Sequence, residues 1–133
     1  MKVFIDSNLL IYLNVLKSTY RAVYENFYLN LLSANKLYLD ALVLDELIYV
    51  SKGRYNVPYE YTLNFFESIV SPYVEILPLG EREYIEASKI LKTYKIKPSD
   101  ALHIAAMTIN GILKIASEDE EAGRVEEIQR IWL

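Results

Sequence analysis

Three acidic residues of this chain follow or open apolar segments. Asp6 comes directly after the run Lys2–Ile5, and Asp119 follows the run Ile112–Ala116. Asp100 lies in the first turn of an apolar helical stretch. The carboxyl ends of parallel strands and the N-termini of the helices between them meet at one edge of a sheet. If the runs are parallel strands, the three carboxylates converge there. Taken alone, Asp6 is equally well explained as the cap of the following helix.

A second kind of acidic position lies inside a helical stretch. The segment Ala41–Val50 is apolar on nearly all sides except at Asp45 and Glu46. A buried carboxylate is costly unless it is paired, hydrogen-bonded or bound to a metal. At least one of the two is therefore expected to have a partner, and the periodicity alone does not say which.

Carboxylates gathered at one place raise one another's pKa, and a divalent cation removes this cost. The chain has no cysteine and one histidine, which favours Mg²⁺ or Mn²⁺ over Zn²⁺. Such an ion, held by carboxylates, is suited to phosphodiester hydrolysis. Ser7 and Ser117 stand next to strand-end acids. Their hydroxyls could orient a carboxylate or simply cap helices.

The elements that would position these residues alternate along the chain. Strands are predicted at Lys2–Ile5, Lys36–Leu39, Val74–Leu77, Ile112–Ala116 and Ile131–Leu133. Helices are predicted after Asn8, at Tyr20–Leu32, from Asp40 to about Lys52, at Tyr59–Ser71, Glu81–Tyr94, from Pro98 to Asn110–Gly111, and ending near Ile128. This pattern predicts a three-layer α/β/α fold with a parallel sheet of four to five strands and helices on both faces. The length of 133 residues predicts one domain, residues 1–133.

Composition excludes several classes of protein. A hydrophobic share of 53% indicates a folded chain, and the absence of cysteine excludes disulfides, thiolate nucleophiles and zinc–sulfur sites. It also fits a reducing cytoplasm. No signal peptide is evident, and no apolar run approaches the roughly 20 residues of a membrane-spanning helix, so we expect no membrane association. The four glycines are scattered singly, which excludes a Gly-rich phosphate loop.

The net charge of −4 is not typical of a general nucleic-acid binder. If four carboxylates are assigned to a metal site, 14 acids remain against 14 Lys and Arg. Phosphate would then be attracted by bound cations and local basic residues.

Two further features have a functional and a structural interpretation. His103, one helical turn after Asp100, could act as a general base. A packed or hydrogen-bonded helix position is the commoner explanation, because a metal-activated water needs no imidazole. An aromatic stripe in the second helix could stack RNA bases, although such stripes are more often core or dimer faces. The stripe contains Tyr20, Val23, Tyr24, Phe27, Leu31 and Leu32.

The order of these motifs resembles that of PIN domains. The resemblance extends from Met1 to the C-terminus and is most specific at Lys97–Ala106. It rests on Ile5-Asp6-Ser7-Asn8, Glu46-Leu47, Lys97-Pro98-Ser99-Asp100-Ala101-Leu102-His103-Ile104-Ala105-Ala106 and Ser117-Glu118-Asp119.

By this resemblance, the chain would be a Mg²⁺- or Mn²⁺-dependent endoribonuclease similar to VapC-type toxins. It would be a homodimer held inactive by a small VapB-like antitoxin. The resemblance selects Glu46 over Asp45 and implies metal-ligand roles for Asp6, Glu46, Asp100 and Asp119, with Asn8 supporting the site. A housekeeping RNA-processing nuclease would use the same site.

One segment departs from the family pattern. An aromatic or large apolar residue commonly follows the fourth acid, whereas Glu120-Glu121-Ala122-Gly123 follows here. The fourth acid could therefore be Asp119, Glu118 or Glu120, and the chain could be a catalytically silent scaffold that binds an antitoxin or RNA. A phosphatase-like site is disfavoured, because no acid stands two residues after Asp6.

Overall fold

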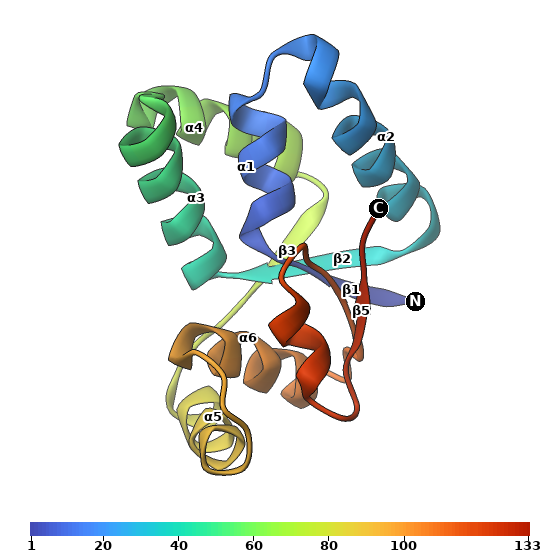
Figure 1. The fold of residues 1–133 in the computed structure, drawn as a ribbon, viewed down its shortest axis with the longest axis vertical. Coiled ribbons are helices and arrows are strands. Elements are labelled where there is room, and N and C mark those ends of the chain that lie inside the picture. Colours follow the sequence, from blue (N-terminus) through green and yellow to red (C-terminus); the bar gives the residue numbers. More distant parts are fainter.

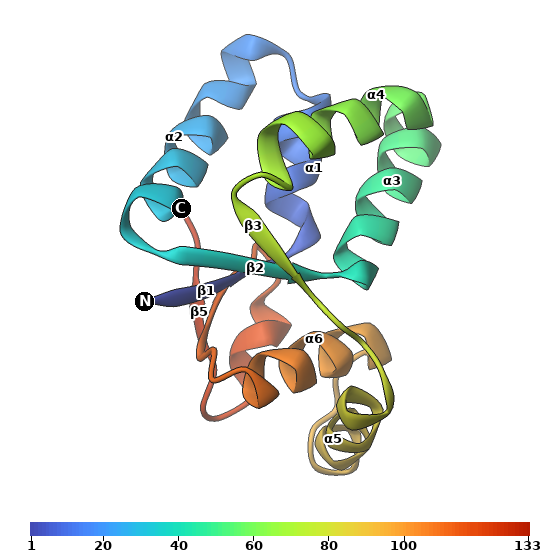
Figure 2. The same cartoon turned by 180° about the vertical axis from the view of Figure 1, so that it is seen from behind.

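The computed structural model describes all of residues 1–133 as three layers (Figure 1). A five-stranded, fully parallel sheet has the strand order β3-β2-β1-β4-β5. Helices α1 to α4 lie on one side of the sheet, and α5 and α6 lie on the other (Figure 1). Seen from behind, β3 forms the edge of the sheet (Figure 2). The α/β/α fold and the parallel sheet predicted from the sequence are thus confirmed.

The strands are short, and the most apolar one is central. Val3, Phe4 and Ile5 of β1 are fully buried because helices cover both faces of the sheet. The strands are β1 (Lys2–Ile5), β2 (Lys36–Asp40), β3 (Val74–Leu77), β4 (Lys114–Ala116) and β5 (Gln129–Ile131).

Six α-helices connect and cover the strands. Asp6 caps α1, Asp40 caps α3, and Pro98 occupies the first turn of α6, as their positions in the sequence predict. The helices are α1 (Ser7–Val15), α2 (Ser18–Ala34), α3 (Ala41–Tyr55), α4 (Tyr59–Phe65), α5 (Glu81–Thr93) and α6 (Pro98–Ile109). No helix is long and apolar enough to span a membrane.

Several boundaries differ from the sequence prediction. The stretch predicted as one helix over Tyr59–Ser71 divides into α4 and a π-helix at Phe66–Val70. Strand β4 begins at Lys114 and not at Ile112, because the Ile112 N–H still bonds to the carbonyl of Met107 at the end of α6. Gly111, with a φ of 69°, makes this closure possible.

The C-terminal elements also differ. The predicted helix ending near Ile128 is a 3₁₀-helix at Glu120–Arg124, and the last strand lies two residues earlier than expected. Trp132 packs against the rings of Tyr24 and Phe27 on α2. Of the apolar run at the C-terminus, Ile131 therefore belongs to β5, whereas Trp132 packs on α2 outside the sheet.

The aromatic stripe of α2 is only partly a core face. Its members Tyr24, Phe27, Leu31 and Leu32 pack against the core, whereas Tyr20 and Val23 are exposed. Tyr28, which lies outside the stripe, is buried and donates its hydroxyl to the carbonyl of Ile69 at 2.8 Å. The core side of α2 is therefore rotated from the predicted stripe toward Tyr28.

Candidate functional site

Asp6 directly follows the central strand β1 and is buried at the carboxyl edge of the sheet. Its Oδ1 accepts the N–H of Ser7 at 2.8 Å, so it does cap α1. Its Oδ2 accepts the hydroxyl of Ser117, from the end of β4, at 2.7 Å. The two interpretations of Asp6 are thus compatible, because one oxygen caps the helix and the other faces the neighbouring strand.

The turn after β4 is anchored on several sides. The Ser117 hydroxyl also accepts the N–H of Asp119 at 3.1 Å, and Arg130 donates to the carbonyl of Ser117 at 2.9 Å. The hydroxyl of Tyr12 on α1 donates to Glu118 at 2.7 Å. Asp119 in turn accepts the N–H of Glu121 at 2.9 Å and caps the 3₁₀-helix. These bonds fix the position of Asp119 relative to Asp6.

Three carboxylates gather where this turn meets α6. One oxygen each of Asp100, Asp119 and Glu121 lies within 4.8 Å of the others. Oδ2 of Asp100 and Oε2 of Glu121 are buried and have no hydrogen-bond partner. Buried acceptors without a donor are costly, and a cation would satisfy both. The all-oxygen donor set fits a hard divalent cation.

The pKa of Asp100 is raised by its burial among other carboxylates. Burial and the charge of Asp6 raise it from 3.8 to about 6, with smaller contributions from Asp119 and Glu121. The charge of His103 acts in the opposite direction but does not compensate. A bound cation would reverse the balance and favour the ionised form.

The structure places two of the four predicted acids, Asp100 and Asp119, in the group of close carboxylates. Asp6 lies outside that group, but near enough for its charge to raise the pKa of Asp100. Glu46 lies outside the group of close carboxylates. Asp45 and Glu46 are both exposed, so the expectation that one of them is buried and needs a partner is wrong. The reason is the packing of α3, which buries Val43, Leu47 and Ser51 and turns the acids toward solvent.

Glu121 is the residue that sequence reasoning missed. The alternatives to Asp119 were Glu118 and Glu120, but Glu118 is exposed and bonded to Tyr12, and Glu120 is exposed. A 3₁₀-helix starting at Glu120 turns Glu121 back toward its cap, Asp119. The only signal in the sequence is the spacing of two residues between Asp119 and Glu121.

His103 and the polar residues near Asp6 have structural partners. The Nδ1 of His103 lies 2.7 Å from Oδ2 of Asp40, and both side chains are buried. Burial opposes protonation, but the hydrogen bond and charge of Asp40, with smaller contributions from Asp6 and Asp100, raise the pKa of His103. His103 is thus a hydrogen-bonded helix residue. Ser7 is buried and Asn8 half-buried at the start of α1.

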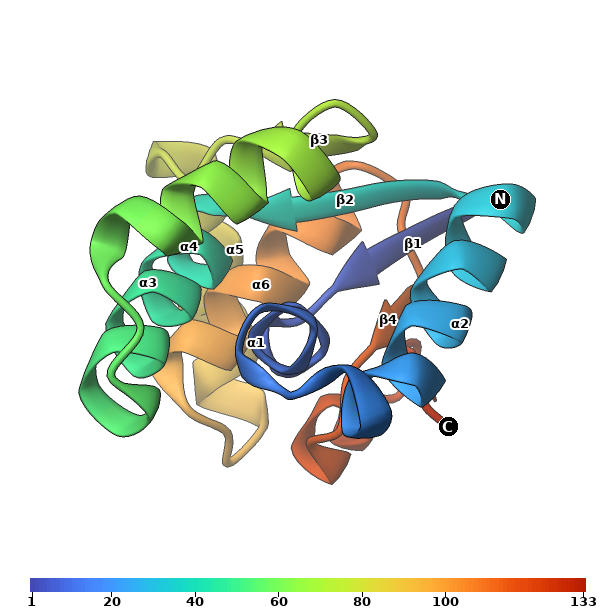
Figure 3. The same cartoon turned by 90° about the horizontal axis from the view of Figure 1, so that it is seen from above.

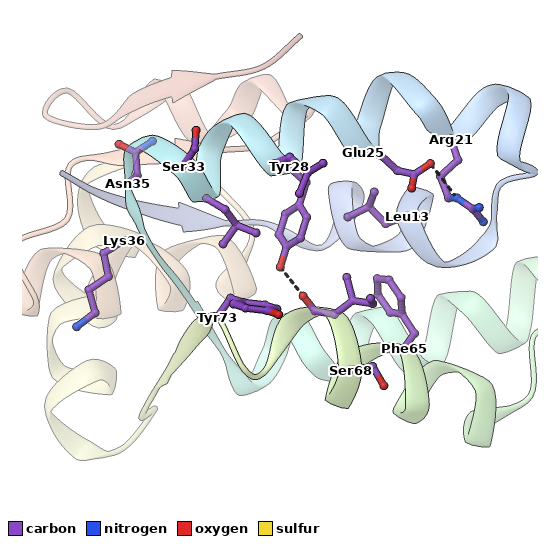
Figure 4. A pocket seen from close by; sticks show the side chains of 13 residues that line it. Leu13, Arg21, Glu25, Tyr28, Ser33, Asn35, Lys36, Phe65, Ser68 and Tyr73 are labelled. Carbon is purple, nitrogen blue, oxygen red and sulfur yellow. Dashed lines mark hydrogen bonds and ion pairs between the residues drawn. The ribbon is translucent and has the colours of Figure 1, made fainter.

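A separate apolar groove lies between α2 and the segment formed by α4 and the π-helix (Figure 4). Its volume is about 1090 Å³. The hydrogen bond from Tyr28 to Ile69 crosses it, and the ion pair of Arg21 with Glu25 lies at one end. The exposed apolar side chains of Leu29, Ile69 and Tyr73 line it, together with Leu13, Leu32 and Phe65. None of the clustered acids contributes to this groove.

Comparison with known proteins identifies one family. The model of the PIN domain matches residues 3–128. Comparison with curated proteins gives no match.

Several solved structures share the fold. VapC20 of Mycobacterium tuberculosis, described as a toxin that cleaves the sarcin–ricin loop, is 14% identical; 93% of this chain and 95% of that chain are covered, with a TM-score of 0.75. VapBC2 of Rickettsia felis, bound to promoter DNA, is 18% identical; 99% of this chain and 98% of that chain are covered, with a TM-score of 0.73. DNA-bound VapBC of Salmonella typhimurium is 21% identical; 99% of this chain and 98% of that chain are covered, with a TM-score of 0.71.

Proposed function

The chain belongs to the PIN-domain family, and from this premise we propose that it is a metal-dependent endoribonuclease that hydrolyses RNA phosphodiester bonds. The observation that carries the proposal is the group of carboxylates at the carboxyl edge of the sheet. Two of its buried oxygens, on Asp100 and Glu121, have no donor. A structural cluster would satisfy these oxygens with N–H or O–H groups, whereas a cation site leaves them free.

We assign the metal-ligand roles to Asp6, Glu46, Asp100 and Asp119, and add Glu121 as a further ligand. A bound Mg²⁺ or Mn²⁺ would neutralise the scissile phosphate, lower the pKa of a water and stabilise the leaving oxygen. Glu46 is exposed and is the least constrained of these acids. It is assigned from the family pattern.

The surrounding residues hold the acids in place. The hydroxyl of Ser117 connects Oδ2 of Asp6 to the N–H of Asp119, and thereby joins two of the proposed ligands. Ser7 and Asn8 form the first turn of α1 behind Asp6. His103 is occupied by Asp40 and is given no role in proton transfer.

We further propose that the protein is the toxin of a VapBC-type pair, acts as a homodimer in the cytoplasm, and forms one domain over residues 1–133. The VapBC complexes among its structural neighbours support a small antitoxin partner. The groove beside α2 supports the same partner, because an amphipathic helix could bury an apolar face there without touching the acids.

The test is RNA cleavage by the purified, partner-free protein in the presence of Mn²⁺, with EDTA and the Asp6→Asn variant in parallel. We expect cleavage that requires the metal and vanishes in the variant. Cleavage that persists in EDTA, or in Asp6→Asn at the wild-type rate, would refute the mechanism.

A catalytically silent scaffold is the second candidate. The position of Glu46 outside the carboxylate group favours it, because a site lacking one ligand can still bind an ion. This candidate predicts that the protein binds Mn²⁺ and an antitoxin but cleaves no RNA at any metal concentration.

A further inference from the structure

The turn after β4 carries four consecutive acids, residues 118–121, but only two of them join the carboxylate cluster. Asp119 and Glu121 are half-buried and lie close to Asp100. Glu118 and Glu120 are exposed. Successive side chains thus alternate between the cluster and solvent, so a slip of one residue along the chain would present the other two acids to the cluster. Some contact must therefore select one pair of acids over the other.

The hydroxyl of Tyr12 on α1 holds the first of these acids outside the cluster. It donates to Oε1 of Glu118 at 2.7 Å, although the two residues are 106 positions apart in the sequence. Burial, together with the hydrogen bond and the charge of Glu118, raises the pKa of Tyr12, so the phenol remains a donor at neutral and mildly alkaline pH. A hydrogen bond to a carboxylate is stronger than one between neutral groups. The bond therefore favours the arrangement in which Glu118 faces α1 and its neighbour Asp119 faces the cluster.

The ring of Tyr12 is itself held by α2 and by the C-terminal segment. Its centroid is 4.7 Å from that of Tyr24 on α2, and Tyr24 in turn packs on Trp132 with centroids 6.3 Å apart. Viewed from above, α1 stands end-on between α3 and α2, and it packs against both (Figure 3). The donor to Glu118 is therefore carried by a ring that other elements of the fold keep in place.

The other bonds to the four acids are local. Asp119 accepts the N–H of Glu121, and Arg124 pairs with Glu121 at 3.6 Å. These partners belong to the same turn and 3₁₀-helix, so they would move with it. Ser117 bonds to the backbone N–H of Asp119 and fixes where the turn begins. Tyr12 is the only residue outside the segment 117–124 that bonds to a side chain of the four acids. Its bond is thus the one long-range contact that distinguishes the two pairs.

We propose that Tyr12 is a positioning residue of the carboxylate site: by holding Glu118 on the side of α1, its hydroxyl selects Asp119 and Glu121 as the acids that face Asp100. Tyr12 acts only through Glu118 and contacts neither the ion nor the substrate. The inference rests on the proposed function in so far as these acids bind a metal ion, and it adds the contact that decides which acids do so.

The test compares variants that break this bond with variants that match them chemically. Tyr12→Phe removes the donor, and Glu118→Ala removes the acceptor. Glu120→Ala is matched to Glu118→Ala, because it removes the same charge from a neighbouring exposed residue. Tyr94→Phe is matched to Tyr12→Phe, because the Tyr94 hydroxyl also bonds to a distant residue. It accepts the N–H of Glu126, which is not part of the cluster.

Two measurements follow the site in each variant. Isothermal titration gives the affinity for Mn²⁺, and hydrogen exchange of the metal-free protein in EDTA reports how firmly the N–H of Glu121 is held. Tyr12→Phe and Glu118→Ala are each expected to weaken Mn²⁺ binding about tenfold, whereas the two controls should stay within about twofold of wild type. Exchange at Glu121 should become faster in the two test variants and stay unchanged in the controls.

The double variant Tyr12→Phe/Glu118→Ala decides whether the two residues act together. If they act through one bond, the double variant binds Mn²⁺ about tenfold more weakly than wild type, like either single variant, whereas independent effects would multiply to about 100-fold. If Tyr12→Phe lowers the stability of the whole fold, the comparison of Glu118→Ala with Glu120→Ala still decides, because both residues are exposed.

Equal Mn²⁺ affinities and exchange rates in Glu118→Ala and Glu120→Ala would overturn the inference, and so would losses that multiply in the double variant. If the wild type cleaves RNA with Mn²⁺ and every variant matches it, the proposed function stands and the inference falls. If the wild type neither binds Mn²⁺ nor cleaves RNA, the proposed function falls. Faster exchange at Glu121 in the test variants alone would then still support the role of Tyr12, and unchanged exchange would refute it.

Discussion

Asp6 and Asp40 occupy equivalent places on neighbouring parallel strands, yet their surroundings differ. Each ends its strand, is buried, and caps the helix that follows. The Oδ1 of Asp40 accepts the N–H groups of Leu42 and Val43, and its Oδ2 faces His103 at 2.7 Å. Asp40 is therefore fully satisfied by groups that stay in place.

Asp6 has one backbone donor and one hydroxyl donor, and it lies near Asp100. Its charge raises the pKa of Asp100, and the cluster around Asp100 leaves two buried oxygens without donors. No histidine neutralises Asp6 directly. From this difference we expect the role of a strand-end aspartate to depend on the charge of the residues that face it, and not on its own position in the strand.

Replacing Asp100 by Asn should give the largest difference in activity between the acidic cluster around Asp6 and the pair of Asp40 with His103. Loss of this ligand is expected to reduce Mn²⁺-dependent RNA cleavage by on the order of 10³-fold or more, because several kcal/mol of transition-state stabilisation come from the ion. Asp40→Asn, which keeps the shape and an acceptor oxygen, should stay within about tenfold of wild type. Equal losses in the two variants would show that the distinction between the acidic cluster and the pair of Asp40 with His103 is mistaken. Initial rates at saturating Mn²⁺ measure both.

For the free energy of unfolding we expect the opposite order, with the larger loss at Asp40. Asp40→Ala leaves His103 buried without its partner and removes the cap of α3, so we expect the free energy of unfolding to fall by about 3–5 kcal/mol. Asp6→Ala should cost less, because relief of its repulsion with Asp100 offsets the lost hydrogen bonds. Urea unfolding of the metal-free proteins gives both values. A larger loss in Asp6→Ala would reverse the assignment of the structural role.

The sequence predicted the features that depend on local signals and topology. The alternation of apolar runs and amphipathic segments gave the α/β/α fold, and Asp40 and Pro98 marked the beginnings of α3 and α6 correctly. The parallel sheet alone predicted that Asp100 and Asp119 lie close together and that Asp6 lies near them, because the strand ends and helix N-termini share one edge.

What could not be predicted depends on contacts between distant residues. Glu121 reaches the cluster because the turn before it is fixed by Tyr12 and Arg130, which are far away in the sequence. The exposure of Glu46 depends on which face of α3 packs on its neighbours. A helix that is apolar on nearly all sides carries no signal for that choice. The pair of Asp40 and His103 spans 63 residues and has no local signature.

The hydroxyl of Ser117 bonds to both Asp6 and Asp119. Its removal tests whether these bonds distinguish the acidic cluster from the buried pair of Asp40 and His103. Ser117→Ala is expected to weaken Mn²⁺ binding by about 10- to 100-fold, because Asp6 and Asp119 lose the donor and acceptor that orient them. Ser51→Ala is the matched control: Ser51 of α3 is also buried and accepts a hydrogen bond, from Asn14 of α1, but it does not contact any of the clustered acids. Isothermal titration with Mn²⁺ should show no change in Ser51→Ala. Equal affinities of Ser117→Ala and wild type would remove Ser117 from the site.

The smallest expected effect is the pH dependence of stability in EDTA. The pKa of Asp100 is raised from 3.8 to about 6 in the folded protein. The folded state therefore binds this proton more tightly than the unfolded state, and its contribution to stability is full below pH 3.8 and is lost as the pH rises through about 6.

Asp100→Asn removes this contribution. The variant and the wild type should be equally dependent on pH below about 4, and above pH 6 the variant should gain about 1 kcal/mol relative to wild type, a value reduced for the partial exposure of the carboxylate. The pKa of His103 is raised mainly by Asp40, which both proteins keep, and the smaller contribution of Asp100 is lost in the variant. Urea unfolding at pH 4 and pH 7.5 measures the change, and Mn²⁺ should reverse its sign at pH 7.5 by stabilising only the wild type. A difference that does not vary with pH would mean that Asp100 is not held among like charges, and the contrast with Asp40 would then rest on hydrogen bonding alone.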